Sequence, residues 1–181
     1  NNKSDIYLFY TVNLAKKTDL SAAGYIKTIF PEAWFIFMGP SPTCEAADYL
    51  VCNRSIVIRG EMEETAFELA SIFPYLLAGN SEILSSISGI SYKIKGEIRH
   101  NPARQPIENI DKIPFPARHL IKKDRYYNPK LGIKPFTAIL TSRGCPFRCR
   151  YCVPNSQSFS RELAYRQVHK NYSKPNESTA Y

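Results

Sequence analysis

Three cysteines in the last quarter of the chain are spaced closely enough to bind a single metal centre. They are Cys145, Cys149 and Cys152, in the run Arg-Gly-Cys-Pro-Phe-Arg-Cys-Arg-Tyr-Cys, with gaps of three and two residues. Such short gaps place the three sulfurs on one compact loop. A structural zinc ion or a closed iron–sulfur cluster takes four protein ligands, so three thiolates leave one coordination position open. An open position of this kind usually serves chemistry, because an outside molecule can bind there.

This spacing, with an aromatic residue before the last cysteine, resembles the signature of the radical S-adenosylmethionine (SAM) enzymes. The resemblance implies a 4Fe–4S cluster held by Cys145, Cys149 and Cys152, with the fourth iron chelated by the amino and carboxylate groups of SAM. It also implies that Tyr151 lies near the adenine. An electron donor such as flavodoxin or ferredoxin would then reduce the cluster.

Other interpretations of the cysteines stay open. A zinc site would be completed by His169, Cys44 or Cys52, although zinc modules normally bring a second ligand pair at a comparably short spacing. The three thiols could also be buried side chains that share a segment by coincidence. We interpret Cys44 and Cys52 as ordinary buried or half-buried thiols, because the five cysteines form no regular disulfide framework.

Two arginines, Arg143 and Arg148, accompany the cysteines in the same loop. An arginine side chain keeps its proton at neutral pH, which excludes it as a conventional general base. We therefore expect both arginines at the surface or paired with carboxylates.

Composition restricts the class of protein. The chain has 181 residues, of which 44% are hydrophobic and 22% are charged, as in soluble globular proteins. No apolar run is long enough to span a bilayer, and the N-terminal Asn-Asn-Lys-Ser-Asp lacks the pattern of a signal peptide. The sequence therefore predicts a cytoplasmic protein without a membrane span.

Charge is distributed unevenly along the chain. Residues 1–90 contain 6 Lys+Arg and 10 Asp+Glu, whereas residues 91–181 contain 18 and 6. This contrast predicts two different units. The basic half could serve RNA, an anionic substrate or the charged groups of a cofactor. Most basic patches are solvated surface, so we expect no nucleic-acid partner.

The first part of the chain alternates between strand and helix patterns. Apolar runs predict strands at 6–12, 33–38 and 55–58, the first of them covered on both faces. Helical patterns follow at 19–30, in a short helix capped by Thr43, and at 63–73. This order predicts a doubly wound, Rossmann-like α/β sheet with parallel strands, in which ligands bind at the carboxyl ends of the strands.

Two glycines, Gly39 and Gly60, fall at those carboxyl ends. Each could let backbone approach a cofactor, and each could equally serve only to make a tight turn. The surrounding runs FIFMGPSPT (35–43) and VIRGEMEETAFEL (57–69) resemble the later half of the cobalamin-binding domain that precedes many radical SAM modules. This resemblance implies that Gly39 and Gly60 are cofactor-binding residues.

Several positions depart from the cobalamin-binding pattern. The family usually has glycine, histidine and glycine where this chain has Met38, Ser41 and Met62. A larger side chain at Met38 or Met62 could obstruct the nucleotide tail of a corrinoid. The axial-ligand motif Asp-x-His-x-x-Gly is also absent from the sequence. We expect the chain to be a fragment, truncated at both ends.

The resemblance implies that the chain is organised in three segments. Residues 1–78 form the C-terminal part of a cobalamin-binding domain, and residues 79–131 form a hairpin turning on Lys95-Gly96 and a proline-rich connector. Residues 132–181 start a radical SAM domain, with the first strand of a partial (β/α) barrel at 136–141 and then the cluster loop.

The resemblance implies reductive cleavage of SAM to a 5′-deoxyadenosyl radical, for cobalamin-dependent methylation or for cyclisation of an unknown substrate. One alternative is a tRNA methylthiotransferase, whose N-terminal domain carries its own cluster cysteines; Cys44 and Cys52 alone cannot complete such a cluster. Another alternative is a non-catalytic zinc or RNA-binding module.

Overall fold

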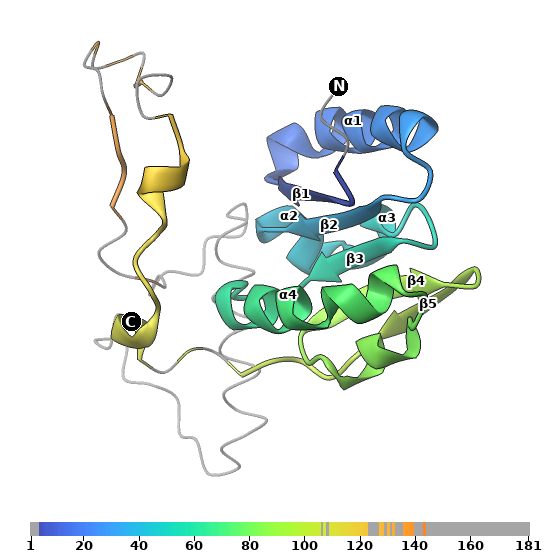
Figure 1. Cartoon of the computed structure of the whole chain (residues 1–181). Coiled ribbons are helices and arrows are strands. Elements are labelled where there is room, and N and C mark those ends of the chain that lie inside the picture. Colours follow the sequence, from blue (N-terminus) through green and yellow to red (C-terminus); the bar gives the residue numbers. More distant parts are fainter. Residues whose placement is uncertain are drawn as a thin grey trace.

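The computed structural model describes residues 4–105, 107, 109–122, 127–128, 130, 132, 136–139 and 143 (Figure 1). The cysteine loop, including Cys145, Cys149, Tyr151 and Cys152, lies outside these residues. The elements are β1 (Ile6–Tyr10), η1 (Asn13–Ala15), α1 (Lys16–Ile29), β2 (Trp34–Met38), α2 (Pro40–Cys44), α3 (Ala46–Tyr49), β3 (Ser55–Ile58), α4 (Glu63–Leu77), η2 (Glu82–Ser86), β4 (Ile90–Ile94), β5 (Glu97–His100), η3 (Ile110–Lys112) and η4 (Arg118–Leu120).

The five strands form one sheet in the order β1-β2-β3-β4-β5. Strands β1, β2 and β3 are parallel, with Tyr7 opposite Phe35 and Phe37 opposite Val57. The hairpin of β4 and β5 continues the sheet in antiparallel fashion, and it turns at Lys95 and Gly96 as predicted. The parallel part confirms the prediction of a Rossmann-like α/β arrangement.

Alternate residues of β2 and β3 face two separate apolar cores, which explains why both strands are buried along their full length. One core lies between the sheet and α4, and it contains Trp34, Ile36, Ile58, Leu69 and Phe73. The other lies under α1 and α3, and it contains Ala23, Phe35, Phe37, Tyr49 and Val57. The helices on the two faces hold the carboxyl ends of β2 and β3 in fixed positions.

The prediction that the first strand is covered on both faces is wrong. β1 is the edge strand of the described sheet, and the side chains of Leu8 and Tyr10 are 61% and 59% exposed. They share a face with Ile36 and Met38, but the core under α4 is built from β2, β3 and β4, and of β1 only Ile6 packs against it. An apolar run alone does not reveal which strand lies at an edge.

The short helix predicted from Thr43 is also placed differently. The chain forms two short helices, and the first of them begins at Pro40, immediately after Gly39. Proline suits the first turn of a helix because its missing N–H has no intrahelical acceptor there. Cys44, expected to be buried or half-buried, is exposed at the end of α2, whereas Cys52 is buried as expected.

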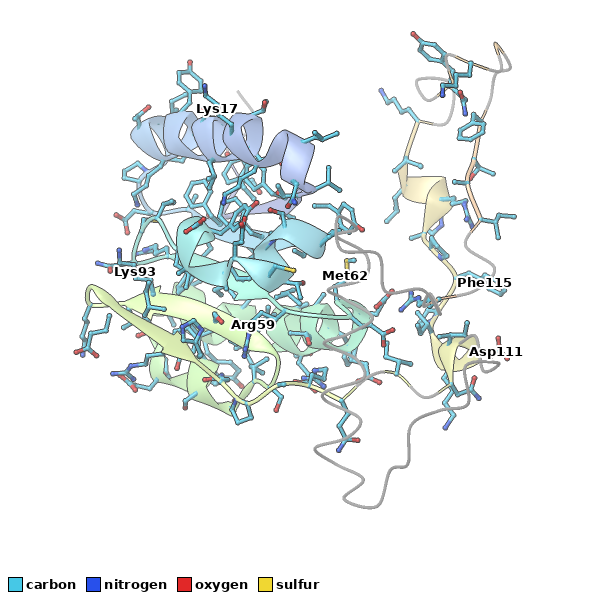
Figure 2. All side chains as sticks on the ribbon, turned by 180° about the vertical axis from the view of Figure 1, so that it is seen from behind. Lys17, Arg59, Met62, Lys93, Asp111 and Phe115 are labelled. Atoms are coloured by element: carbon cyan, nitrogen blue, oxygen red, sulfur yellow. The ribbon has the colours of Figure 1, made fainter. Side chains whose placement is uncertain are left out.

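After β5 the connector first follows the sheet and then leaves it (Figure 1). Figure 2 shows Asp111 and Phe115 away from the sheet, and the side chain of Phe115 is 94% exposed. The strand predicted at 136–141 is not formed over the described residues 136–139. There the guanidinium of Arg118 donates to the Ala138 carbonyl at 2.9 Å and to the Thr137 hydroxyl at 3.0 Å. The Arg118 side chain thus occupies the Ala138 carbonyl, a backbone acceptor that a strand would offer to a neighbouring strand.

None of the helices in the described ranges is long and apolar enough to cross a membrane.

Candidate functional site

Position 39 requires glycine because the segments that follow β1 and β2 pack closely against each other there. Its backbone has φ 106° and ψ −173°, a region that is essentially restricted to glycine. A Cβ added at Gly39 would lie 2.8 Å from the carbonyl oxygen of Thr11, which follows β1. Thr11 is itself fixed there, because its N–H donates to the Met38 carbonyl at 2.8 Å. The chain's own backbone therefore fills the space beside Gly39.

Gly60 has a different environment. It also has a positive φ, of 81°, but no atom lies within 4 Å of an added Cβ. The Gly60 N–H donates to the Thr43 hydroxyl at 3.1 Å, and that hydroxyl donates to the Gly39 carbonyl at 2.8 Å. Thr43 thus connects the turns that follow β2 and β3, while the Cα of Gly60 faces open space that a ligand could enter.

The positions that depart from the cobalamin-binding pattern are covered by the chain itself. Met38 is buried in the core under α4, and Met62 packs against the same core. Ser41 is fully buried, and its hydroxyl accepts a hydrogen bond of 2.7 Å from the hydroxyl of Tyr49. Burial raises the pKa of Tyr49, so this hydroxyl keeps its proton and remains a donor. The described residues therefore offer an opening at Gly60 and none at Ser41.

The bond between Tyr49 and Ser41 should stabilise this end of the sheet. We expect Tyr49→Phe to lower the free energy of unfolding by about 1–2 kcal/mol, because it leaves the buried Ser41 hydroxyl without its partner. Denaturant titration would measure the change. The matched control is Tyr25→Phe, since Tyr25 is 69% exposed, and it should change the free energy by less than about 0.5 kcal/mol. Equal effects of the two substitutions would contradict the role assigned to Tyr49.

A shallow cavity of about 450 Å³ opens beside the carboxyl end of β3. One Nη of Arg59 donates to the Ile90 carbonyl at 3.1 Å and also to the Asn101 carbonyl, and burial lowers the pKa of Arg59. Figure 2 shows Arg59 beside the hairpin. Asp48 and Glu45, which also line the cavity, form ion pairs with Lys16, and the hydrogen bonds from Lys16 to these carboxylates raise the pKa of Lys16. The lining residues are Thr43, Cys44, Glu45, Ala46, Ala47, Asp48, Arg59 and His100.

Arg143 lies between two carboxylates that follow β3. Its Nη1 is 3.7 Å from Glu61 Oε1, and its Nη2 forms an ion pair with Glu63 Oε1. Burial acts to raise the pKa of Glu63, but the hydrogen bond and charge of Arg143, together with backbone hydrogen bonds at Glu63 and Met62, outweigh burial, and the pKa is lowered. The same bond raises the pKa of Arg143. The expectation that Arg143 pairs with carboxylates is confirmed.

The predicted iron ligands, Cys145, Cys149 and Cys152, lie outside the described residues, as do Tyr151, Arg148 and His169. Among residues 4–105 and the described positions beyond them, no group of three or more His, Cys, Asp or Glu side chains could hold a metal ion. The metal site therefore stays a prediction from the sequence. The structure does bring Gly39, Gly60 and Arg143 to the same edge of the sheet, through Thr43, Glu61 and Glu63.

Sequence reasoning missed Thr43 as the link between the glycine turns and missed the carboxylates that receive Arg143. A signal for the carboxylates was present, because Glu61 and Glu63 directly follow a buried strand and Gly60. Carboxylates in that position lie at the ligand-binding edge of a parallel sheet. What the sequence does not contain is the identity of their partner, which is 80 residues away from Glu63.

Comparison with known proteins finds similarity to a protein of Pyrococcus horikoshii named as an uncharacterized methyltransferase. The two sequences are 40% identical over 101 residues, which make up 56% of this chain and 20% of the relative. The match thus spans about a fifth of the relative's length. No protein-family model matches the chain.

Proposed function

We propose that this chain belongs to a radical SAM enzyme that carries out a methylation. The observation that carries the proposal is the run of Cys145, Cys149 and Cys152 with Tyr151 before the last cysteine. Three thiolates are sufficient for three irons of a 4Fe–4S cluster and leave the fourth iron for SAM. The similarity to a protein named as a methyltransferase supports the choice of reaction.

The residues of the chain have separate roles in this proposal. The three thiolates would hold the cluster, and Tyr151 would contribute an aromatic ring near the adenine of SAM. When bound and reduced, such a cluster would supply the electron that cleaves SAM, and a donor such as flavodoxin or ferredoxin would return an electron to the cluster. The protein's own contribution is to orient SAM and the substrate and to exclude water from the reacting atoms.

Cobalamin is a separate, additional cofactor in the proposal. The open space at Gly60 fits the approach of a ligand, whereas Gly39 is packed against Thr11 and Ser41 is bonded to Tyr49. A corrinoid would therefore contact the edge of the sheet at Gly60. Nothing in the proposed cleavage of SAM depends on its presence.

Reconstitution with iron and sulfide under anaerobic conditions tests the proposal. We expect an absorption band of a 4Fe–4S cluster that disappears when Cys145, Cys149 or Cys152 is changed to alanine, because only these cysteines are spaced closely enough to converge on one cluster. The controls Cys44→Ser and Cys52→Ser should keep the band. Bound zinc without sulfide in elemental analysis would instead support the zinc module, and a sequence-selective RNA complex at physiological salt would support the tRNA methylthiotransferase.

A further inference from the structure

The ion pair of Arg143 differs from an ordinary surface pair. The side chains of Arg143, Glu61 and Glu63 are 23%, 20% and 29% exposed, so most of each is removed from water. Exposed ion pairs contribute little to stability, whereas a shielded pair with hydrogen-bond geometry holds its partners in a defined arrangement. Arg143 is therefore fixed to the segment that follows β3.

The two carboxylates are held in place by other parts of the fold. Glu61 Oε2 accepts a hydrogen bond of 2.7 Å from the backbone N–H of Ile107, whose side chain is 6% exposed. Glu63 is the first residue of α4, and that helix is packed on the sheet through Leu69 and Phe73. The site that receives Arg143 is thus built from the strand end, the helix and the connector together.

Arginine suits this site better than lysine does. A planar guanidinium presents several N–H donors in a fixed geometry, so its two Nη atoms can pair with two carboxylates at the same time. The same helix repeats the arrangement with Arg104 of the connector, which pairs with Glu64 at 3.5 Å and also with Glu68. The first turns of α4 therefore receive two arginines from later parts of the chain.

Arg143 lies next to the predicted cluster ligands in the sequence. It precedes Cys145 by two residues, and two residues of extended chain span at most about 7 Å between Cα atoms. Glu61 directly follows Gly60, the residue whose Cα faces open space. Arg143, bound to Glu61 and Glu63, thus lies at the ligand-binding edge of the sheet, two residues before Cys145 in the sequence.

We propose that Glu61 and Glu63 form a carboxylate dock for Arg143, which positions the cysteine loop beside Gly60. Arg143 is a positioning residue in this arrangement: it brings the predicted cluster cysteines to the edge of the sheet and contributes no proton to the reaction. The importance of the dock for catalysis rests on the proposed function, whereas the contact itself does not require a cluster.

Hydrogen exchange of the chain without any cluster tests the contact. We expect Arg143→Gln to increase the exchange of amides in 61–66 and at Ile107 about tenfold, because a charge-assisted hydrogen bond that shields this segment is lost. Arg143→Lys should give a smaller increase. Arg99→Gln is the matched control, since the side chain of Arg99 is 45% exposed and its ion pairs are long, at 3.6 Å to Glu97 of the hairpin and 3.9 Å to Glu82 of η2. It should leave exchange in 61–66 unchanged.

Exchanging the charges of Arg143 and Glu63 distinguishes loss of this ion pair from a general loss of structure. Arg143→Glu should increase exchange in the same segment, and combining it with Glu63→Arg should restore most of the protection. Wild-type exchange in Arg143→Gln, or no recovery in the swapped pair, would overturn the dock.

A second measurement tests positioning in the reconstituted protein. A nitroxide label on the exposed Cys44, which lies at the same edge of the sheet, should relax faster when the 4Fe–4S cluster is reduced. Arg143→Gln should reduce this enhancement severalfold while iron and sulfide contents stay unchanged. An unchanged enhancement would overturn the positioning role. The expected changes in hydrogen exchange together with no cluster in any protein, wild type included, would instead reject the proposed function and leave the contact of Arg143 with Glu61 and Glu63 standing.

Discussion

Replacing Cys149 with alanine is expected to abolish the formation of 5′-deoxyadenosine from SAM. The substitution removes one of three cluster ligands, and two thiolates cannot hold the 4Fe–4S cluster through which the electron must pass. The protein used should carry this chain together with the SAM-binding barrel that the resemblance implies, and it should be supplied with a low-potential reductant. Anaerobic chromatography of the nucleoside product measures the effect, which we expect to be a complete loss.

The Tyr151→Ala substitution distinguishes ligation of the cluster from binding of SAM in the same assay. An aromatic ring beside the last ligand contributes stacking and no coordination, so the cluster should remain while SAM binding weakens by about 1 kcal/mol. Formation of 5′-deoxyadenosine by Cys149→Ala at the wild-type rate would remove the proposed mechanism. It would do so whatever the fold of the remaining protein.

The secondary structure of the first hundred residues is largely predictable because strong local signals determine it. The strand predicted at 55–58 has the bounds of β3, and the hairpin turns at Lys95-Gly96, the position that the sequence predicts. A glycine in a short polar turn and a compact apolar run are local features that can be identified in a single sequence. The parallel arrangement of β1, β2 and β3 follows from their order with helices between them.

The features that the sequence does not predict depend on contacts between distant segments. The exposure of Leu8 and Tyr10 in β1 depends on where α4 packs. The hairpin joins the sheet by pairing with β3, and no local pattern in the hairpin sequence identifies that partner. The residue type of Thr43 favours a helix cap, but Gly60, which follows the next strand, uses its hydroxyl instead. The carboxylates that pair with Arg143 could not be predicted either, because ion pairs between distant residues produce no periodic pattern in the sequence.

The same limit applies to the two glycines, which look alike in the sequence. Both follow buried strands, and the resemblance to a cobalamin-binding domain implies the same cofactor-binding role for both. Both also have positive φ in the structure. Their surroundings differ, because Gly39 contacts Thr11 whereas Gly60 faces open space. Only one of the two positions therefore has room for a ligand beside it, and a substitution experiment can distinguish them.

Gly39→Ala is expected to lower the free energy of unfolding by about 3 kcal/mol or more. The glycine-only backbone region contributes about 1–3 kcal/mol of this cost. The contact of 2.8 Å between the new Cβ and the Thr11 carbonyl oxygen contributes about another 1–3 kcal/mol, since neither backbone can move freely. Denaturant titration of the purified chain measures the sum, and β1 should lose protection from hydrogen exchange before the rest of the sheet does.

Gly60→Ala is the matched substitution, and its cost should be only about 1–2 kcal/mol, because the positive φ is unfavourable but the added Cβ meets no other atom. The same methyl group would stand in the space through which we propose that a corrinoid approaches. In a protein that binds cobalamin through this edge, Gly60→Ala should therefore weaken cobalamin binding while the protein stays folded, which absorbance titration with hydroxocobalamin would detect. Equal losses of stability from the two substitutions would contradict the difference in packing, and undiminished binding by Gly60→Ala would place any corrinoid away from Gly60.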